Sequence, residues 1–243
     1  MFKFFNKEKW HYKPTVIEQE DNPKNDKPIM EEPIYNNYNG TVILLDNGHS
    51  RLTAGKRSPV LEDGSQFFEY EFNRDIVRRI SQKLDVLGIK YHILVPEVDE
   101  DIALTARANR ANKYCKQYGT DKCIFISIHA NAAGNGSWMN ARGWSIWTTK
   151  GETKADKVAT VFYEEAVKLL PDYGMSVRKD LSDGDVDYEA NFTVLYKTLC
   201  PAILTENLFM DNKIDVRFLM TNTGRNVIAD IHVNAIKRLC GLC

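Results

Sequence analysis

Short apolar runs alternate with longer amphipathic stretches along most of this chain. Strands are predicted where apolar and β-branched residues cluster, at 41–46, 89–95, 123–128, 142–149 and 201–206. Helices are predicted where apolar residues recur at helical spacing, near 68–87, 102–118, 152–170, 211–221 and 224–239. This alternation predicts an α/β fold with a mainly parallel, twisted sheet and helices on both of its faces.

Residues 1–40 have a different composition from the rest of the chain. After an aromatic and basic start they are rich in Glu, Asp, Lys and Asn, with Pro23, Pro28 and Pro33 spaced through them. Such a segment buries too little apolar surface to fold alone. We therefore expect residues 1–40 to form an extended or flexible N-terminal arm, and residues 41–243 to form a single catalytic domain.

The net charge and the distribution of apolar residues limit the kinds of binding partner expected for this chain. The 243 residues are 43% hydrophobic and carry a formal net charge of −1, so no strong attraction to nucleic acid is expected. The first residues, MFKFFNKEKWHYK, lack the continuous apolar core of a secretory signal, and we expect no signal peptide. No apolar stretch is long enough to predict a transmembrane segment.

Two of the predicted strands run into a histidine. His49 follows the apolar run VILLD, and His129 ends the run CIFISI. If the strands are neighbours, both imidazoles lie at one edge of the sheet, where ligands of α/β proteins gather. Two nitrogen ligands on rigid elements are a common beginning of a zinc site, which then needs a third ligand, often a carboxylate. For a single histidine at such a place we would favour a role as a strand cap only, and the second histidine changes this interpretation.

The predicted helix at 68–87 offers two acids near its start. At about 100° per residue, Glu69 falls within the buried stripe formed by Phe72, Ile76 and Ile80, whereas Glu71 falls on nearly the opposite side. An inward carboxylate is costly without a partner. A metal, an ion pair or the amides of the helix N-terminus would each satisfy Glu69, so the helical pattern alone leaves its role open.

Further candidates follow later strands. Glu206 ends the apolar run PAILT, which adds another carboxylate at a strand end. Asn131 and Arg142 flank the same region and are candidate substrate-binding residues, although a turn cap and a surface charge are equally good interpretations. The segment 172–193 is expected to be a polar surface excursion that lines the site. Its acids suggest calcium only weakly, because DLSDGDVD lacks the spacing of an EF-hand loop.

Six motifs occur in a fixed order between Val42 and Leu239: LDNGHS, EYEFN, LTARANRAN, FISIHAN, RGWSIW and PAILTENLFMDN. With these motifs the chain resembles the zinc-dependent N-acetylmuramoyl-L-alanine amidases of the amidase-3 family, which bacteria and phages use to cut peptidoglycan. The resemblance implies that His49, Glu69 and His129 bind Zn²⁺ and that Glu206 acts in catalysis. It also implies hydrolysis of the amide bond between N-acetylmuramic acid and L-alanine by zinc-activated water, at the cell wall.

Some features depart from the family pattern. The chain has Asn47-Gly48-His49-Ser50 where the family commonly has Pro-Gly-His-Gly, and the acidic stretch 178–190 has no clear counterpart. Two alternatives are another zinc peptidase or amidase acting on cell-wall peptides, and a non-catalytic cell-wall-binding module that kept the fold. The module would be expected to lose ligands, yet all four key positions are present. The expected lack of a signal peptide and of cell-wall-binding repeats favours a phage lysin or a component of a phage particle.

Overall fold

The computed structural model describes residues 37–242 of the chain. The predicted arm at 1–40 therefore lies mostly outside the described residues. Its last part contacts the end of the domain: the Asn39 amide donates a hydrogen bond to the carbonyl of Cys240 (3.1 Å), and the Asn39 side chain donates to the carbonyl of Leu239 (2.8 Å). The segment just before the first strand is thus fixed to the last helix.

The described residues form a six-stranded sheet with the order β2-β1-β3-β6-β4-β5. The strands are β1 (Val42–Asp46), β2 (Tyr91–Ile93), β3 (Cys123–Asn131), β4 (Ser145–Thr148), β5 (Tyr188–Glu189) and β6 (Ala202–Phe209). β2, β1, β3 and β6 are parallel neighbours, β4 runs antiparallel to β6, and β5 runs parallel to β4. The predicted mainly parallel sheet is confirmed.

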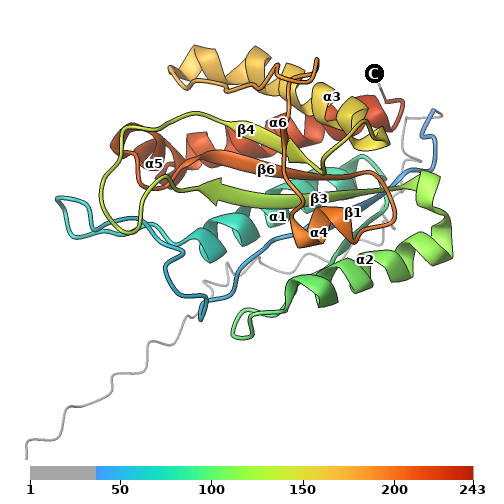
Figure 1. Ribbon diagram of the computed structural model, residues 1–243, viewed down its shortest axis with the longest axis horizontal. Coiled ribbons are helices and arrows are strands. Elements are labelled where there is room, and N and C mark those ends of the chain that lie inside the picture. Colours follow the sequence, from blue (N-terminus) through green and yellow to red (C-terminus); the bar gives the residue numbers. More distant parts are fainter. Residues whose placement is uncertain (1–36, 243) are drawn as a thin grey trace, which may run out of the picture. The chain divides into compact units, whose positions relative to one another are not determined.

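Helices cover both faces of the sheet (Figure 1). They are α1 (Glu69–Val86), α2 (Leu104–Tyr118), α3 (Lys154–Leu169), α4 (Thr193–Tyr196), α5 (Lys213–Met220) and α6 (Asn222–Leu239). α6 packs between α1 and α3 on one face, with α5 beside it, and α2 and α4 pack together on the other face. The predicted α/β architecture with two covered faces is confirmed.

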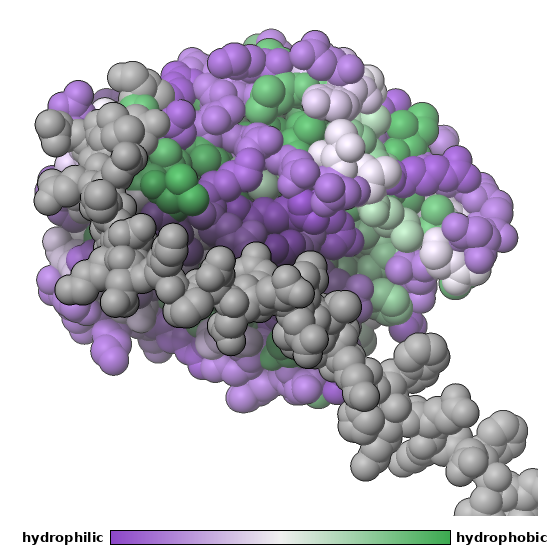
Figure 2. Space-filling model, turned by 180° about the vertical axis from the view of Figure 1, so that it is seen from behind, coloured by the Kyte–Doolittle hydropathy of each residue, from purple (hydrophilic) through white to green (hydrophobic). Residues whose placement is uncertain are grey.

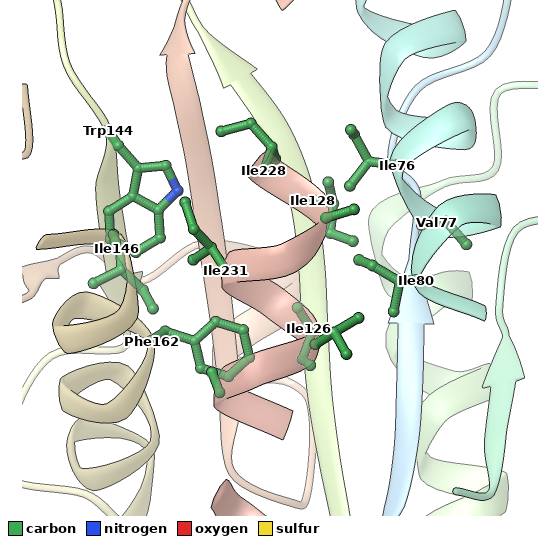
Figure 3. Packing of buried hydrophobic residues seen from close by; sticks show 14 of the residues in the cluster. Ile76, Val77, Ile80, Ile126, Ile128, Trp144, Ile146, Phe162, Ile228 and Ile231 are labelled. Carbon is green, nitrogen blue, oxygen red and sulfur yellow. The ribbon is translucent and has the colours of Figure 1, made fainter. Parts of the chain in front are cut away.

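The larger core lies between the sheet and the face covered by α1, α3 and α6. Figure 3 shows Ile80 of α1, Ile126 of β3, Phe162 of α3 and Ile231 of α6 pointing toward one another. All four side chains are fully buried. Burial of one such side chain contributes about 1.5–3 kcal/mol, so this face holds the strands that carry the site rigidly in place.

The structure extends two strands beyond their predicted ends. β3 continues to Asn131 and β6 to Phe209, so His129 and Glu206 lie inside paired strands. The two residues are opposite each other in the register, which then shifts between His129 and Asn131. The sequence pattern ended each strand at or just before its first ionisable residue, but ladder hydrogen bonds between neighbouring strands do not depend on the side chains.

The excursion at 172–193 also holds more structure than its composition predicts. It contains β5 and leads into α4, elements of two and four residues that are too short to show a periodicity. α2 begins at Leu104, and the acids before it do not cap it: Asp101 pairs with the buried Arg107 instead (3.0 Å). Residues 37–242 include no helix apolar and long enough to cross a bilayer. Hydrophilic residues occupy much of the face shown in Figure 2.

Candidate metal and catalytic site

The two histidines meet at the carboxyl ends of β1 and β3. After β1 the chain turns at Gly48, whose φ of 64° is in the left-handed region that favours glycine. A Cβ atom on Gly48 would lie only 2.5 Å from Cε1 of His129. Glycine thus allows the loop that carries His49 to pass directly over the second imidazole, and the two rings lie with centroids 4.9 Å apart.

Glu69 is the first residue of α1 and points into the domain. Its side chain is 1% exposed, whereas Glu71 is exposed, as the helical pattern predicted. Phe67 and Phe72 on either side are buried against each other, with ring centroids 5.3 Å apart, and fix the start of the helix. The first turn of α1 therefore delivers a carboxylate beneath the two imidazoles.

The three side chains converge on one point. Oε1 of Glu69 lies 2.9 Å from Nδ1 of His129 and 3.5 Å from Nε2 of His49. One ligand atom from each of the three residues lies within 4.8 Å of the others. Ligands bound at about 2.0–2.1 Å to a tetrahedral ion are about 3.4 Å apart, so these separations suit a single zinc ion.

The donor chemistry of the cluster also fits a cation. His129 Nε2 faces the Ser127 hydroxyl (3.1 Å), which donates to Oδ2 of Asp46 (2.7 Å). This arrangement places the ring proton of a neutral His129 on Nε2 and leaves a lone pair on Nδ1, opposite Glu69. Two acceptors then face each other, and they need a shared proton or metal ion. Oε2 of Glu69 is buried without a hydrogen-bond partner among the described residues.

Burial and mutual contact shift the pKa values of these groups. Burial lowers the pKa of His49 to about 3, although Glu69 acts in the opposite direction. Burial alone would raise the pKa of Glu69, but the hydrogen bond and charge of His129 outweigh it and lower that pKa to about 2. For His129, burial opposes protonation and the hydrogen bond to Glu69 outweighs it, which raises the pKa. Ionised Glu69 beside the imidazoles makes a strong cation-binding set.

Glu206 lies next to this cluster on β6, directly opposite His129 in the register. Residues aligned on neighbouring parallel strands present their side chains on the same face. Oε2 of Glu206 is buried and has no hydrogen-bond partner among the described residues. Burial raises the pKa of Glu206 to about 7, with His129 acting in the opposite direction. A carboxyl group free to exchange a proton thus stands beside the three residues that could hold a metal ion.

Comparison with known families agrees with this geometry. The family model for N-acetylmuramoyl-L-alanine amidase, of the amidase-3 type, matches residues 43–238, which is most of the chain. The chain belongs to this amidase family. The resemblance drawn from the sequence motifs is thereby confirmed, as is the class of enzyme, a peptidoglycan amidase.

Individual relatives of this amidase-family chain come from bacteria and phages. It is 27% identical to the endolysin of Bacillus phage SPP1 over 205 residues, which are 83% of this chain and 66% of the endolysin. It is 28% identical to the N-acetylmuramoyl-L-alanine amidase CwlM of Bacillus licheniformis over 82% of this chain and 69% of that protein. The chain thus spans about two thirds of the length of each of these two relatives.

Solved amidase structures share the fold. The crystal structure of the N-acetylmuramyl-L-alanine amidase Ami1 from Mycobacterium smegmatis aligns with a TM-score of 0.64 at 20% sequence identity. The alignment covers 84% of this chain and 99% of Ami1. At this identity the likeness shows the fold alone, a single α/β domain built around the same kind of sheet.

The two predicted substrate-binding residues make contacts within the protein. The Asn131 side chain accepts a hydrogen bond from the Ala132 amide (2.8 Å). Arg142 lies 3.4 Å from Oδ1 of the buried Asp215 and donates to the carbonyl of Gly174 (3.0 Å). None of these three contacts involves His49, Glu69 or His129, and substrate binding by Asn131 and Arg142 stays a prediction.

Several residues of the amidase site were not singled out from the sequence. Asp46 and Ser127 lie in the middle of the sheet as fully buried polar residues and support His129. Asn207, also fully buried, donates to the carbonyl of His129 (2.9 Å) and accepts from the indole of Trp144 (2.8 Å). The usable signal was a polar residue within an apolar strand, because such a group needs a buried partner.

Proposed function

We propose that this chain is a zinc-dependent N-acetylmuramoyl-L-alanine amidase that hydrolyses the amide bond between the lactyl group of N-acetylmuramic acid and L-alanine in peptidoglycan. One observation carries the proposal: His49, Glu69 and His129 offer ligand atoms within 4.8 Å of one another, beside the unpartnered carboxyl of Glu206. Family membership over residues 43–238 supplies the substrate class.

In this proposal the three ligands hold the metal and the surrounding groups hold the ligands. Ser127 and Asp46 fix the tautomer of His129 through the two hydrogen bonds described above. Arg74 donates to the carbonyl of His49 and so fixes the loop after β1. A zinc ion bound here would polarise the substrate carbonyl and make a bound water more acidic.

Glu206 moves the proton. Its Oε2 accepts a proton from the attacking water, as the water oxygen bonds to the lactyl carbonyl carbon. The same carboxyl then delivers the proton to the alanine nitrogen as the carbon–nitrogen bond breaks. The products are a free lactyl carboxylate and a peptide with a free L-alanine amine, so water is fully accounted for. The position of Glu206 opposite His129 on a rigid strand suits this proton transfer.

We further propose that the chain acts on the bacterial cell wall as a phage lysis enzyme. The support is its similarity to an endolysin of a Bacillus phage and to a Bacillus amidase. Peptidoglycan is the macromolecular partner in this role.

Product analysis tests the proposed bond. The full chain, loaded with zinc, is incubated with purified peptidoglycan, and the soluble fragments are analysed by mass spectrometry. We expect stem peptides that begin with a free L-alanine and glycan strands that carry free lactyl groups. Peptides cut at another bond, with the lactyl–alanine amide intact, would point instead to the other zinc peptidases considered from the sequence.

A substitution at Glu206 separates catalysis from metal binding. We expect Glu206→Gln to lower turnover by about 10²–10⁴-fold, because the proton carrier is lost, while zinc content by elemental analysis stays at the wild-type level. Glu71→Gln on the exposed side of α1 is the control and should keep full activity. Wild-type turnover by Glu206→Gln would reject the role of Glu206, and binding without any cleavage by the wild type would favour the non-catalytic module.

A further inference from the structure

A second group of acids lies on the other side of β6, where β4 and β5 extend the sheet. Asp185 and Asp187 come from the acidic excursion, and Asp156 comes from the first turn of α3. One carboxylate oxygen of each lies within 4.8 Å of the others. The excursion is the part of the chain for which the sequence motifs gave no family counterpart, so the group is a feature of this chain to be explained on its own.

Asp187 is the centre of this acid group. Its side chain is 1% exposed. Oδ2 accepts a hydrogen bond from the Thr148 hydroxyl of β4 (2.6 Å), but Oδ1 is buried without a hydrogen-bond partner among the described residues. Leaving a buried carboxylate oxygen unpaired is costly, so Oδ1 indicates a missing ligand.

The other two acids add negative charge without adding a positive partner. Asp156 accepts hydrogen bonds from the amide and the hydroxyl of Thr153, and Asp185 accepts one from the Asp187 amide. Each carboxylate oxygen has two lone pairs, so both acids keep the capacity to bind a cation. In residues 37–242, none of the three acids takes part in an ion pair with a lysine, arginine or histidine.

We propose that Asp156, Asp185 and Asp187 form a calcium-binding site that fastens the excursion to α3 and β4. The set contains only oxygen donors, which suit a hard cation and not zinc. Two of the donors lie on a loop outside the main strands, and calcium accepts the irregular geometry of such a loop more readily than magnesium does. The EF-hand pattern failed to indicate this site because Asp156 comes from a different segment of the chain.

This site is separate from the amidase centre. In the antiparallel pair of β4 and β6, Ser145 lies opposite Glu206, and Trp147 lies opposite Leu204. Thr148, which holds Asp187, is therefore displaced by three residues along the strand from the position of Glu206, or about 10 Å. Calcium would thus stabilise the fold and take no part in hydrolysis of the substrate amide. The calcium proposal is therefore independent of the proposed amidase function.

Thermal unfolding tests the proposal. The full chain is freed of divalent ions, reloaded with stoichiometric zinc and titrated with calcium chloride or magnesium chloride. Binding to the folded state alone should raise Tm by about 5–10 °C at saturating calcium, and by much less in magnesium. Asp187→Asn and Asp185→Asn should abolish the response, whereas Asp183→Asn, an exposed acid of the same loop, should keep it.

A second readout locates the ion and covers the case in which Asp187→Asn fails to fold. Trp147 stacks on Tyr188, the residue after Asp187, with ring centroids 4.9 Å apart. Terbium, which binds in place of calcium, should luminesce when this aromatic pair is excited, and added calcium should displace terbium and lower the luminescence. The emission should be lost in Asp185→Asn and kept in Asp183→Asn. No shift in the wild type, an equal shift with magnesium, or equal losses in the Asp183 and Asp185 variants would overturn the proposal.

Discussion

Two acid-containing clusters lie in the same sheet, and they differ in the groups around each buried carboxylate. At the carboxyl ends of β1 and β3, Glu69 faces two imidazoles, whereas beside β4 Asp187 faces two other carboxylates and the Thr148 hydroxyl. The first cluster mixes nitrogen and oxygen donors and suits zinc, and the second offers oxygen alone and suits calcium. The donor atoms around a buried acid thus decide which cation the cluster suits.

The two clusters also differ in how the chain holds them. Glu69 begins a helix and His129 lies within a central strand, so two of the three residues of the first cluster rest on regular elements fixed by the core, and the loop after β1 carries His49. Asp185 and Asp187 lie on a loop directly before the two-residue strand β5, which pairs with β4 at the edge of the sheet. Precise ligand geometry suits catalysis, and an irregular oxygen cage suits the fastening of a loop.

The largest test of this contrast removes the carboxylate of the first cluster. We expect Glu69→Ala to lose stoichiometric zinc and at least about 10³-fold of amidase activity, because the metal supplies several kcal/mol of stabilisation to the transition state. Zinc is measured by elemental analysis and activity by release of peptides from peptidoglycan. Glu71→Ala is the control from the same helical turn, and equal losses in both variants would contradict the assignment of Glu69.

His232, a buried histidine outside both clusters, should make the free energy of unfolding depend on pH independently of the two proposed metal sites. His232 faces the Thr205 hydroxyl (3.0 Å) and the carbonyl of Ile228 (2.7 Å). Burial lowers its pKa to about 4, against the effect of the Ile228 hydrogen bond. The pKa of His232 in the unfolded chain is near 6.5. Between about pH 6.5 and pH 4, His232 is therefore protonated in the unfolded chain and neutral in the folded chain.

Stability should consequently fall as the pH is lowered from about 6.5 to about 4, by about 3 kcal/mol from this one group. We expect metal-free His232→Gln to lack this part of the slope when both proteins are unfolded by denaturant across the pH range. All other groups titrate alike in the two proteins and cancel in the difference. Parallel curves for the two proteins would show that His232 contributes nothing to the acid sensitivity.

A smaller effect is expected from the hydroxyl that supports the first cluster. Ser127→Ala removes the link between His129 and Asp46, and such supporting contacts account for about 10–100-fold in metal affinity. Competition with a zinc indicator measures the change. Ser81→Ala is the control, since Ser81 is buried and donates a hydrogen bond to the carbonyl of Arg78 in its own helix, with no contact to His129 or Asp46 among its hydrogen bonds. Unchanged affinity in Ser127→Ala would remove Ser127 from the site.

The smallest expected effect comes from the turn after β1. Gly48→Ala and Gly64→Ala each place a side chain at positive φ, at a cost of about 1–2 kcal/mol in unfolding free energy. Only the Cβ at position 48 meets His129, whereas the one at position 64 has nothing within 4 Å. We therefore expect only Gly48→Ala to lose zinc affinity as well, by about tenfold. Equal zinc affinity in the two variants would show that the close contact is tolerated.

The sequence was sufficient for the fold class and for the convergence of the histidines. Apolar runs that end in His49 and His129 predict strand ends at one sheet edge, and helical spacing selected Glu69 over Glu71. The hydrophobic pattern did not predict that β3 continues past His129. Strands pair through main-chain hydrogen bonds, which do not depend on the side chains that form the pattern. It also missed Ser127, and it did not give the burial of Asp187, because the partners of both residues lie on other elements and depend on tertiary packing.

The contacts of Asn39 with Leu239 and Cys240 bring both extremities of the amidase domain to the same corner. That corner adjoins the beginning of β1, while the proposed zinc ligands lie past the opposite end of the strand. A wall-anchoring module fused to either extremity would therefore emerge from the rear of the enzyme, and the glycan would keep unobstructed access to the cleaving edge.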